Sequence, residues 1–240
     1  MSSIQPAVGS LDLGTLLRGE ADAIASWIAS WTGGRSSQQA LVIIAGAGAF
    51  GAAMGCWRDP TQAVFAGIKL PLIVLVTACG NALINGMLAP LLGLNLTLRQ
   101  SFAAVLMSFG IAAAILGASS PLMAFLVWNL PALQLGVKVT GVVHAVMLLT
   151  LVVVIAFAGI TANLRLLQLL RKLSGDAKTA RRILFAWLAA NLLLGSQISW
   201  ILRPFIGTPG LPVQFLRTDA FHGSFFETVF YAMRRVFHGF

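Results

Sequence analysis

The chain has 240 residues, of which 58% are hydrophobic and only 10% are charged, and its mean hydropathy is +0.88. A soluble domain carries about 25% charged residues, so this composition excludes an ordinary water-exposed surface and predicts a membrane protein. The net charge of +9 could suggest a nucleic-acid partner, but basic residues also collect beside membrane helices. No basic stripe with interleaved aromatic residues occurs in the sequence, so we expect no nucleic-acid binding. We expect an all-α integral membrane protein with about five transmembrane helices and amphipathic surface helices at both termini.

Residues 1–38 are expected to form a cytoplasmic N-terminal segment with an amphipathic helix over 11–32. Apolar residues recur there at helical spacing and would lie on one face that rests on the membrane. These residues are Leu13, Leu17, Ile24, Ile28 and Trp31.

A transmembrane domain is predicted over residues 39–202, with five apolar stretches long enough to cross a hydrocarbon core of about 30 Å. The first stretch is rich in glycine, and Gly51 and Gly55 form a small-xxx-small pair that predicts close helix packing at the centre of a bundle. The five predicted spans are 39–57, 70–92, 101–117, 139–173 and 183–202.

Two segments marked by proline are expected to lie outside these spans. Residues 61–69 are predicted to be a short interfacial segment, with Pro71 opening the second span. The stretch between Pro121 and Pro131 is too short to cross as a helix, so we expect an interfacial or shallow re-entrant segment anchored by Trp128. If residues 121–137 did cross, the C-terminus would move to the other side of the membrane.

The fourth apolar stretch is too long for the bilayer, since a helix over 139–173 reaches ~50 Å. Its second half is therefore expected to leave the membrane and form a cytoplasmic helical hairpin near 163–182, with Gly175 ending one helix and Asp176 capping the next. Six basic residues of this hairpin are candidates for contact with anionic lipid or an acidic partner. They are Arg165, Arg171, Lys172, Lys178, Arg181 and Arg182.

This basic cluster also sets the expected orientation, because Lys and Arg favour the cytoplasmic side. The N-terminus then lies in the cytoplasm and residues 203–240 form a periplasmic interfacial tail. Nine basic residues fall inside and seven outside. The expected compartment is the bacterial inner membrane.

Polar residues within the spans are the candidates for a functional site. Thr77, Asn81 and Asn85 are spaced four apart and share one helix face. They indicate either a polar path or ligand pocket between the second, fourth and fifth helices, or hydrogen bonds that only join helices, which is the interpretation we favour from the sequence. The full candidate set is Thr77, Asn81, Asn85, His144, Asn191 and Gln197.

None of the seven carboxylates lies inside a predicted span, which counts against ion-coupled transport. No carboxylate pair or catalytic motif occurs, so no enzyme is expected. Cys56 and Cys79 lie in apolar runs without ligand spacing, so neither a metal nor a cofactor is expected.

The C-terminal tail is expected to turn back across the bundle. Pro204 stops the fifth helix and Arg203 stands at its outer end, where it can bind phosphate head groups or the last helix carbonyls. Ser224 and Glu227 form a capping box before an amphipathic helix whose apolar residues are Phe226, Val229, Phe230, Met233 and Phe237.

The segments GSQISWILRPFIG, LPVQFLR and FFE resemble the C-terminal signature, with its LRPFIG core, of a group of bacterial multi-pass membrane proteins without an established activity. Five spans with a cytosolic amphipathic N-terminus resemble, more distantly, the Yip (Ypt-interacting protein) family. The Yip resemblance implies a protein that organises membranes or binds partners, and it carries no catalytic residues. The expected function is a non-enzymatic accessory or scaffold protein, as a subunit of a larger membrane assembly or a homo-oligomer. The alternative is a channel or uncoupled transporter with a polar path along Thr77, Asn81 and Asn85.

Overall fold

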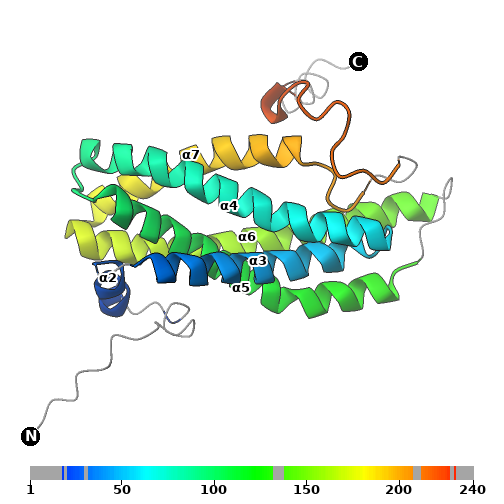
Figure 1. Cartoon of the computed structure of the whole chain (residues 1–240), viewed down its shortest axis with the longest axis horizontal. Coiled ribbons are helices and arrows are strands. Elements are labelled where there is room, and N and C mark those ends of the chain that lie inside the picture. The colour runs from blue at the N-terminus through cyan, green and yellow to red at the C-terminus, as the bar shows by residue number, and fades with distance from the viewer. Residues whose placement is uncertain are drawn as a thin grey trace, which may run out of the picture.

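The structure is a computed structural model that describes residues 18, 21–29, 32–131, 138–207, 212–227 and 230. Within these ranges the secondary structure is helical, without strands, and five helices are long and apolar enough to cross a membrane (Figure 1), as the sequence predicts. The short helix α2 covers Ala21–Ala29. The long helices are α3 (Gly33–Gly55), α4 (Pro60–Leu91), α5 (Leu98–Asn129), α6 (Lys138–Ser174) and α7 (Ala177–Ile201).

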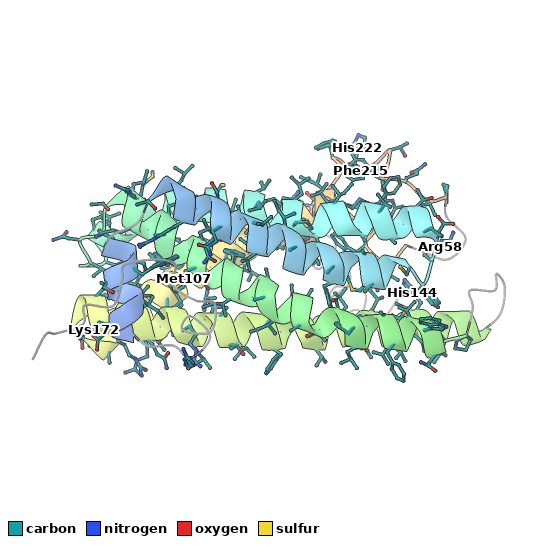
Figure 2. All side chains as sticks on the ribbon, turned by 60° about the horizontal axis from the view of Figure 1, so that its bottom comes forward. Arg58, Met107, His144, Lys172, Phe215 and His222 are labelled. Atoms are coloured by element: carbon teal, nitrogen blue, oxygen red, sulfur yellow. The ribbon has the colours of Figure 1, made fainter. Side chains whose placement is uncertain are left out.

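The long helices alternate in direction, so the bundle has two distinct ends. Helix α2 and the α6–α7 turn lie at one end, which we call the hairpin end (Figure 1). The chain that follows α7 lies toward the opposite end, which we call the tail end. Figure 2 labels Lys172 at the hairpin end and Arg58 and His144 at the tail end.

Helix α3 packs very closely against both α4 and α5, and glycines make this approach possible. A Cβ atom added to Gly55 would lie 2.6 Å from the Cα of Ala63 on α4. One added to Gly117 on α5 would lie 2.8 Å from the Cα of Gly46. No real side chain tolerates such separations, so these positions require glycine, as expected where helix backbones meet in lipid.

Helix α4 is one continuous helix from Pro60 to Leu91, so the prediction of a separate interfacial segment over 61–69 was wrong. Asp59 caps the helix by accepting a hydrogen bond from the Thr61 amide, and Pro60 occupies the first turn, where its missing N–H is not needed. Pro71 therefore lies inside the helix instead of opening it. Internal proline is tolerated in packed membrane helices because neighbouring groups satisfy the freed carbonyls.

Helix α5 also continues past its internal proline, from Leu98 through Pro121 to Asn129, so the predicted re-entrant segment was wrong. Pro121 leaves the carbonyl of Gly117 without its usual amide donor. The Ser120 hydroxyl donates to that carbonyl at 2.7 Å, which preserves the helix. Trp128 lies on this continuous helix and is 90% exposed. Residues 121–129 thus add no separate helix, and 132–137 lie outside the described residues.

The N-terminal helix is described only in part. Ile24, Trp27 and Ile28 of α2 are buried, and Asp22 forms an ion pair with Lys172 of α6 at 2.6 Å. Helix α2 therefore rests on the hairpin end of α6. The other predicted apolar positions, Leu13, Leu17 and Trp31, lie outside the described residues.

Candidate functional site

Buried polar side chains are concentrated on α4. Eight polar or charged residues are buried within the described ranges, and five of them belong to this helix. A helix in lipid satisfies its own backbone, so each of these side chains needs a partner from another segment. The five are Gln62, Lys69, Thr77, Asn81 and Asn85.

Thr77, Asn81 and Asn85 lie toward the middle and the hairpin end of α4, and all three are nearly inaccessible. The Asn81 Nδ2 atom donates a hydrogen bond of 2.9 Å to Asn191 Oδ1 on α7. Thr77 Oγ1, Asn81 Oδ1 and Asn85 Oδ1 have no hydrogen-bond partner among the described residues. If these side chains served only to join helices, they would form hydrogen bonds with one another. Instead, among the described residues this group forms a single hydrogen bond between α4 and α7, from Asn81 to Asn191.

Asn81 and Asn85 line a partly open cavity of about 80 Å³, whose other lining residues come from α5, α6 and α7. Ser108, Asn163 and Trp187 complete its polar lining together with Asn191. The indole N–H of Trp187 is buried and has no partner among the described residues. The apolar part of the wall comprises Val105, Phe109, Ala112, Gly159, Ala162, Leu166 and Leu188.

The cavity is large enough to be occupied. A site for one water needs roughly 10–15 Å³ of comparable volume, so this one has room for several waters or one small organic molecule. Buried polar groups are normally hydrogen-bonded, and leaving one unsatisfied costs about 1–3 kcal/mol. Asn81 Oδ1, Asn85 Oδ1 and Trp187 Nε1 are thus three buried polar atoms, without a hydrogen-bond partner among the described residues, that belong to side chains lining this largely apolar cavity.

Three of the predicted polar residues, Thr77, His144 and Gln197, are not part of the cavity lining. His144 stacks on Trp57 at a ring-centroid distance of 6.1 Å, and Trp57 in turn donates to the carbonyl of Pro131. Gln197 accepts a hydrogen bond of 3.3 Å from the amide of Phe225 in the tail. The structure therefore does not bring these two residues together with the asparagines, since His144 packs at the tail end of the bundle and Gln197 contacts the tail.

The basic residues of the hairpin lie on its surface. Arg165 donates to the side chain of Gln168 at 3.1 Å, and Arg181 donates to the carbonyl of Ala177 at 3.2 Å. Lys172 pairs with Asp22 of α2. The side chains of Arg171, Lys178 and Arg182 are exposed.

The turn of this hairpin is built as the sequence predicts. Gly175 has a positive φ of 68°, a conformation that glycine adopts without strain, and its amide donates to the carbonyl of Arg171. Asp176 caps α7 by accepting hydrogen bonds from Lys178 and Thr179. These bonds, those from Thr179 foremost, lower the pKa of Asp176.

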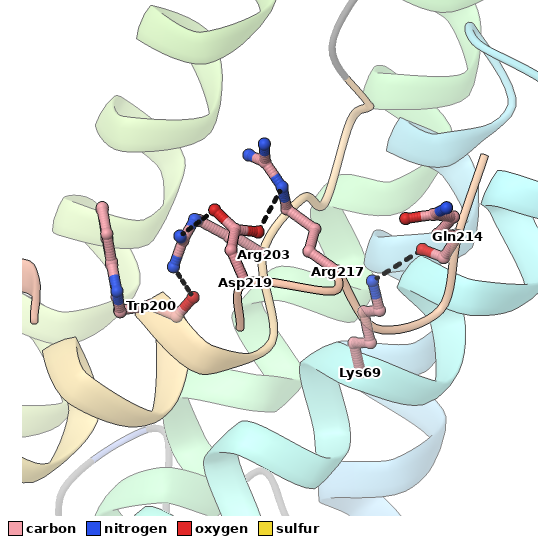
Figure 3. A network of polar contacts seen from close by, with 6 residues as sticks. All are labelled: Lys69, Trp200, Arg203, Gln214, Arg217 and Asp219. Carbon is pink, nitrogen blue, oxygen red and sulfur yellow. Dashed lines mark hydrogen bonds and ion pairs between the residues drawn. The ribbon is translucent and has the colours of Figure 1, made fainter. Parts of the chain in front are cut away.

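A second polar cluster joins α4 to the tail (Figure 3). The Lys69 side chain is fully buried, and its Nζ atom donates to the carbonyls of Pro204 at 3.1 Å and Gln214 at 3.4 Å. Nζ also lies 5.2 Å from the centre of the Phe215 ring. Two turns earlier, Gln62 Nε2 donates to the carbonyl of Phe205 at 2.7 Å. The described tail residues Pro204, Phe205, Gln214 and Phe215 thus contact one side of α4.

Arg203 fixes the start of this tail. Its guanidinium donates to the Trp200 carbonyl at 2.7 Å and to Asp219 at 3.3 Å, and it stacks on the Trp200 ring at 3.5 Å (Figure 3). Burial lowers the pKa of Arg203, and the neighbouring Asp219 opposes that effect. Arg217 also pairs with Asp219, at 3.2 Å. These contacts turn the chain back toward the bundle in the way the Arg-Pro sequence predicts.

The first turn of the predicted C-terminal helix is present, and the Glu227 amide donates to Ser224 Oγ at 3.1 Å. Val229, Met233 and Phe237 of its predicted apolar face lie outside the described residues.

Comparison of the chain with protein-family models, curated proteins and solved structures gives no match in any of the three. The candidate site is therefore interpreted from its own geometry.

Sequence reasoning missed several residues of these sites. Ser108, Asn163 and Trp187 each stand alone in an apolar helix, and no spacing rule connects them to Asn81. Lys69 was missed because it lies at the end of the predicted interfacial segment over 61–69, two residues before Pro71. A usable signal existed, since Gln62 and Lys69 are seven residues apart and share a face of α4.

Proposed function

We propose that this membrane protein is a channel or uncoupled transporter whose solute passes through the cavity beside Asn81 and Asn85. The observation that supports this role over helix joining is the pair of buried carboxamide oxygens without partners among the described residues at this cavity. Uncoupled passage is supported by the placement of the described carboxylates, Asp22, Asp59, Asp176, Asp219 and Glu227. All five lie near helix ends or in the tail, and so none offers a proton or sodium site at mid-membrane.

Solute flux into reconstituted vesicles tests the proposal. Purified protein in liposomes should accelerate the entry of small polar solutes, measured by stopped-flow light scattering. Changing Asn81 and Asn85 together to leucine should abolish the acceleration while the protein still folds, because leucine fills the cavity with apolar atoms. The matched control is Asn129→Leu, since Asn129 lies at the far end of α5 and bonds only to its own helix at Phe125.

Loss of folding in the double variant, together with absence of flux in the parent, would support a packing role for the asparagines. If the parent, the double variant and the Asn129→Leu control all admitted solutes no faster than liposomes without protein, the proposed pathway would be overturned.

A second candidate function is the accessory or scaffold role, as part of a larger assembly or a homo-oligomer. The observation that favours it is the low burial of two helices. Only 22% of the most apolar stretch of α6 and 17% of that of α7 are buried, compared with 61% for α5. Such faces contact either lipid or other membrane subunits. Purification in gentle detergent with mass determination separates these outcomes, because a scaffold should retain partners or self-associate.

The bacterial inner membrane, with the hairpin end in the cytoplasm and the tail in the periplasm, is the orientation we propose. The predicted topology supports it, since nine basic residues fall on its cytoplasmic side and seven on the other side. The exposed hairpin residues Arg171, Lys178 and Arg182 would then face the anionic cytoplasmic leaflet, each contributing about 1 kcal/mol of attraction near the surface.

Neutral substitution of Lys178 and Arg181, which lie farthest from the membrane, tests this contact. Weaker binding of the variant to anionic vesicles at low salt is expected, and unchanged binding would leave these charges with a role in orientation alone.

A further inference from the structure

We propose that the cavity binds a small neutral molecule of the amide or urea class and rejects ions of the same size. The inference deepens the proposed pathway, because this cavity is its binding step, and it concerns which solutes are accepted. It rests on three features of the described residues: the chemistry of the lining, the groups left without partners, and a buried cation on the tail side.

The lining carries no charge of either sign. Its polar members are four asparagines, one serine and one tryptophan, and its other members are apolar. An ion that enters such a site loses its hydration shell and gains no counter-charge, which is far less favourable than the entry of a neutral molecule. The cavity therefore selects against both cations and anions.

The groups without partners define what the guest has to present. Asn81 Oδ1 and Asn85 Oδ1 accept hydrogen bonds, so the guest needs N–H or O–H donors for them. The Trp187 indole only donates, so the guest also needs an acceptor. A primary amide or a urea offers N–H donors and a carbonyl oxygen on one compact frame, and it fits a cavity of about 80 Å³.

Lys69 adds a second barrier to cations. It lies twelve residues before Asn81 on the same helix, or ~18 Å at 1.5 Å per residue. Its Nζ atom contacts only carbonyl oxygens and the Phe215 ring, and no carboxylate within the described ranges pairs with it. Its positive charge lies in a low-dielectric region on the tail side of the cavity and disfavours the approach of a second cation through long-range repulsion.

Three probes of nearly the same shape and different charge test the inference: acetamide, acetate and acetamidinium. Each is added to the purified full chain in detergent, and the midpoint of thermal unfolding is measured over a concentration series. Acetamide should raise the midpoint, because a ligand that binds only the folded state stabilises it. The apparent affinities of acetate and acetamidinium should be weaker by about tenfold or more.

Two variants assign the effect to the cavity. Asn85→Leu should remove the response to acetamide, and Asn129→Leu, which lies outside the cavity, should retain it. Equal responses to all three probes, no response to acetamide, or a full response in Asn85→Leu would each overturn the inference.

Different results would reject the proposed ligand class and the proposed pathway, so the two proposals can be tested separately. Selective binding of acetamide without flux in vesicles would support the ligand class and reject the pathway. Flux that is equally fast for acetamide and acetamidinium would support the pathway and reject the ligand class.

Discussion

The two sides of α4 are built on different principles. Toward α3 the contact is made by small residues, and an added Cβ at Gly51 or Gly55 would overlap the backbone of α4. Toward α7 the contact contains buried amides, and an added Cβ at Gly195 would meet the Thr77 methyl group at an ordinary 3.5 Å. The first side is fixed by shape, whereas the second keeps space and polar groups without partners. The proposed solute site depends on this second kind of contact.

The largest difference in folding stability should appear when side-chain atoms are added at a glycine on each side. Gly51→Leu forces α3 away from α4, because even its Cβ would overlap the Ala66 carbonyl. Overpacking a well-packed contact costs ~1–3 kcal/mol, and here the backbone itself must move, so we expect at least ~3 kcal/mol of lost stability. Gly159→Ala on the cavity wall meets nothing within 4 Å. It should be neutral or stabilising by up to ~1 kcal/mol, through helix propensity.

Thermal unfolding in detergent measures both glycine variants. Similar losses of stability in the two proteins would show that the helices around the cavity are packed as tightly as α3.

Removing the buried ammonium should release the tail from α4. Lys69→Met deletes two hydrogen bonds from a charged donor, each worth ~1.5–3 kcal/mol in a buried setting. The tail should then be cleaved faster by protease added to the tail side of sealed vesicles. The matched control is Lys172→Met at the hairpin end, which breaks an exposed ion pair with Asp22 worth ~0–1 kcal/mol. Equal cleavage of the tail in both variants would mean that Lys69 does not hold it.

A smaller effect of the same kind is expected for Arg203→Leu. The change removes the bonds to the Trp200 carbonyl and to Asp219, and the side chain is only 17% exposed, so we expect a loss of ~1–2 kcal/mol. The tail should become more sensitive to protease from the periplasmic side. Digestion at the parental rate would discard the role of Arg203 in turning the tail back. Cleavage only from the cytoplasmic side would overturn the proposed orientation.

The smallest effect is expected at the hairpin turn, outside the two contact faces of α4. Hydrogen bonds from Thr179 and Lys178 lower the pKa of Asp176 in the folded state, so its contribution to stability is present above the unfolded pKa of about 3.9. The contribution is lost as the pH falls through the lower folded value. Asp176→Ala should therefore unfold at a lower temperature than the parent at neutral pH, and the difference should shrink below pH ~4. A difference that stays constant to pH ~2 would exclude the carboxylate as its cause.

Periodicity and composition predicted the membrane class, the five long helices and the hairpin turn, because each depends on local residues. They failed where proline suggested a helix end. The helix continues through Pro121 because Ser120 supplies the missing donor, and Pro71 lies in the interior of a packed helix. Such compensation depends on particular neighbours, which a proline rule does not include.

The candidate site was predictable only along α4. The four-residue spacing of Thr77, Asn81 and Asn85 identified its shared face, and Asn191 was correctly placed on the partner helix. Ser108 and Trp187 join the cavity lining through helix packing alone, and the same packing places His144 elsewhere, against Trp57. Residue spacing within one sequence does not reveal which helices, far apart in that sequence, contact each other.

The midpoint of thermal unfolding of Asn85→Leu tests the central claim most directly. Asn85 Oδ1 is buried without a partner, and the adjacent cavity has room for the larger side chain. If Asn85 belongs to a solute site, replacing an unsatisfied acceptor by an apolar group should leave the midpoint equal to that of the parent or raise it. If Asn85 instead joins helices by hydrogen bonding, the midpoint should fall by several degrees. A fall would contradict the assignment of this cavity as a binding site.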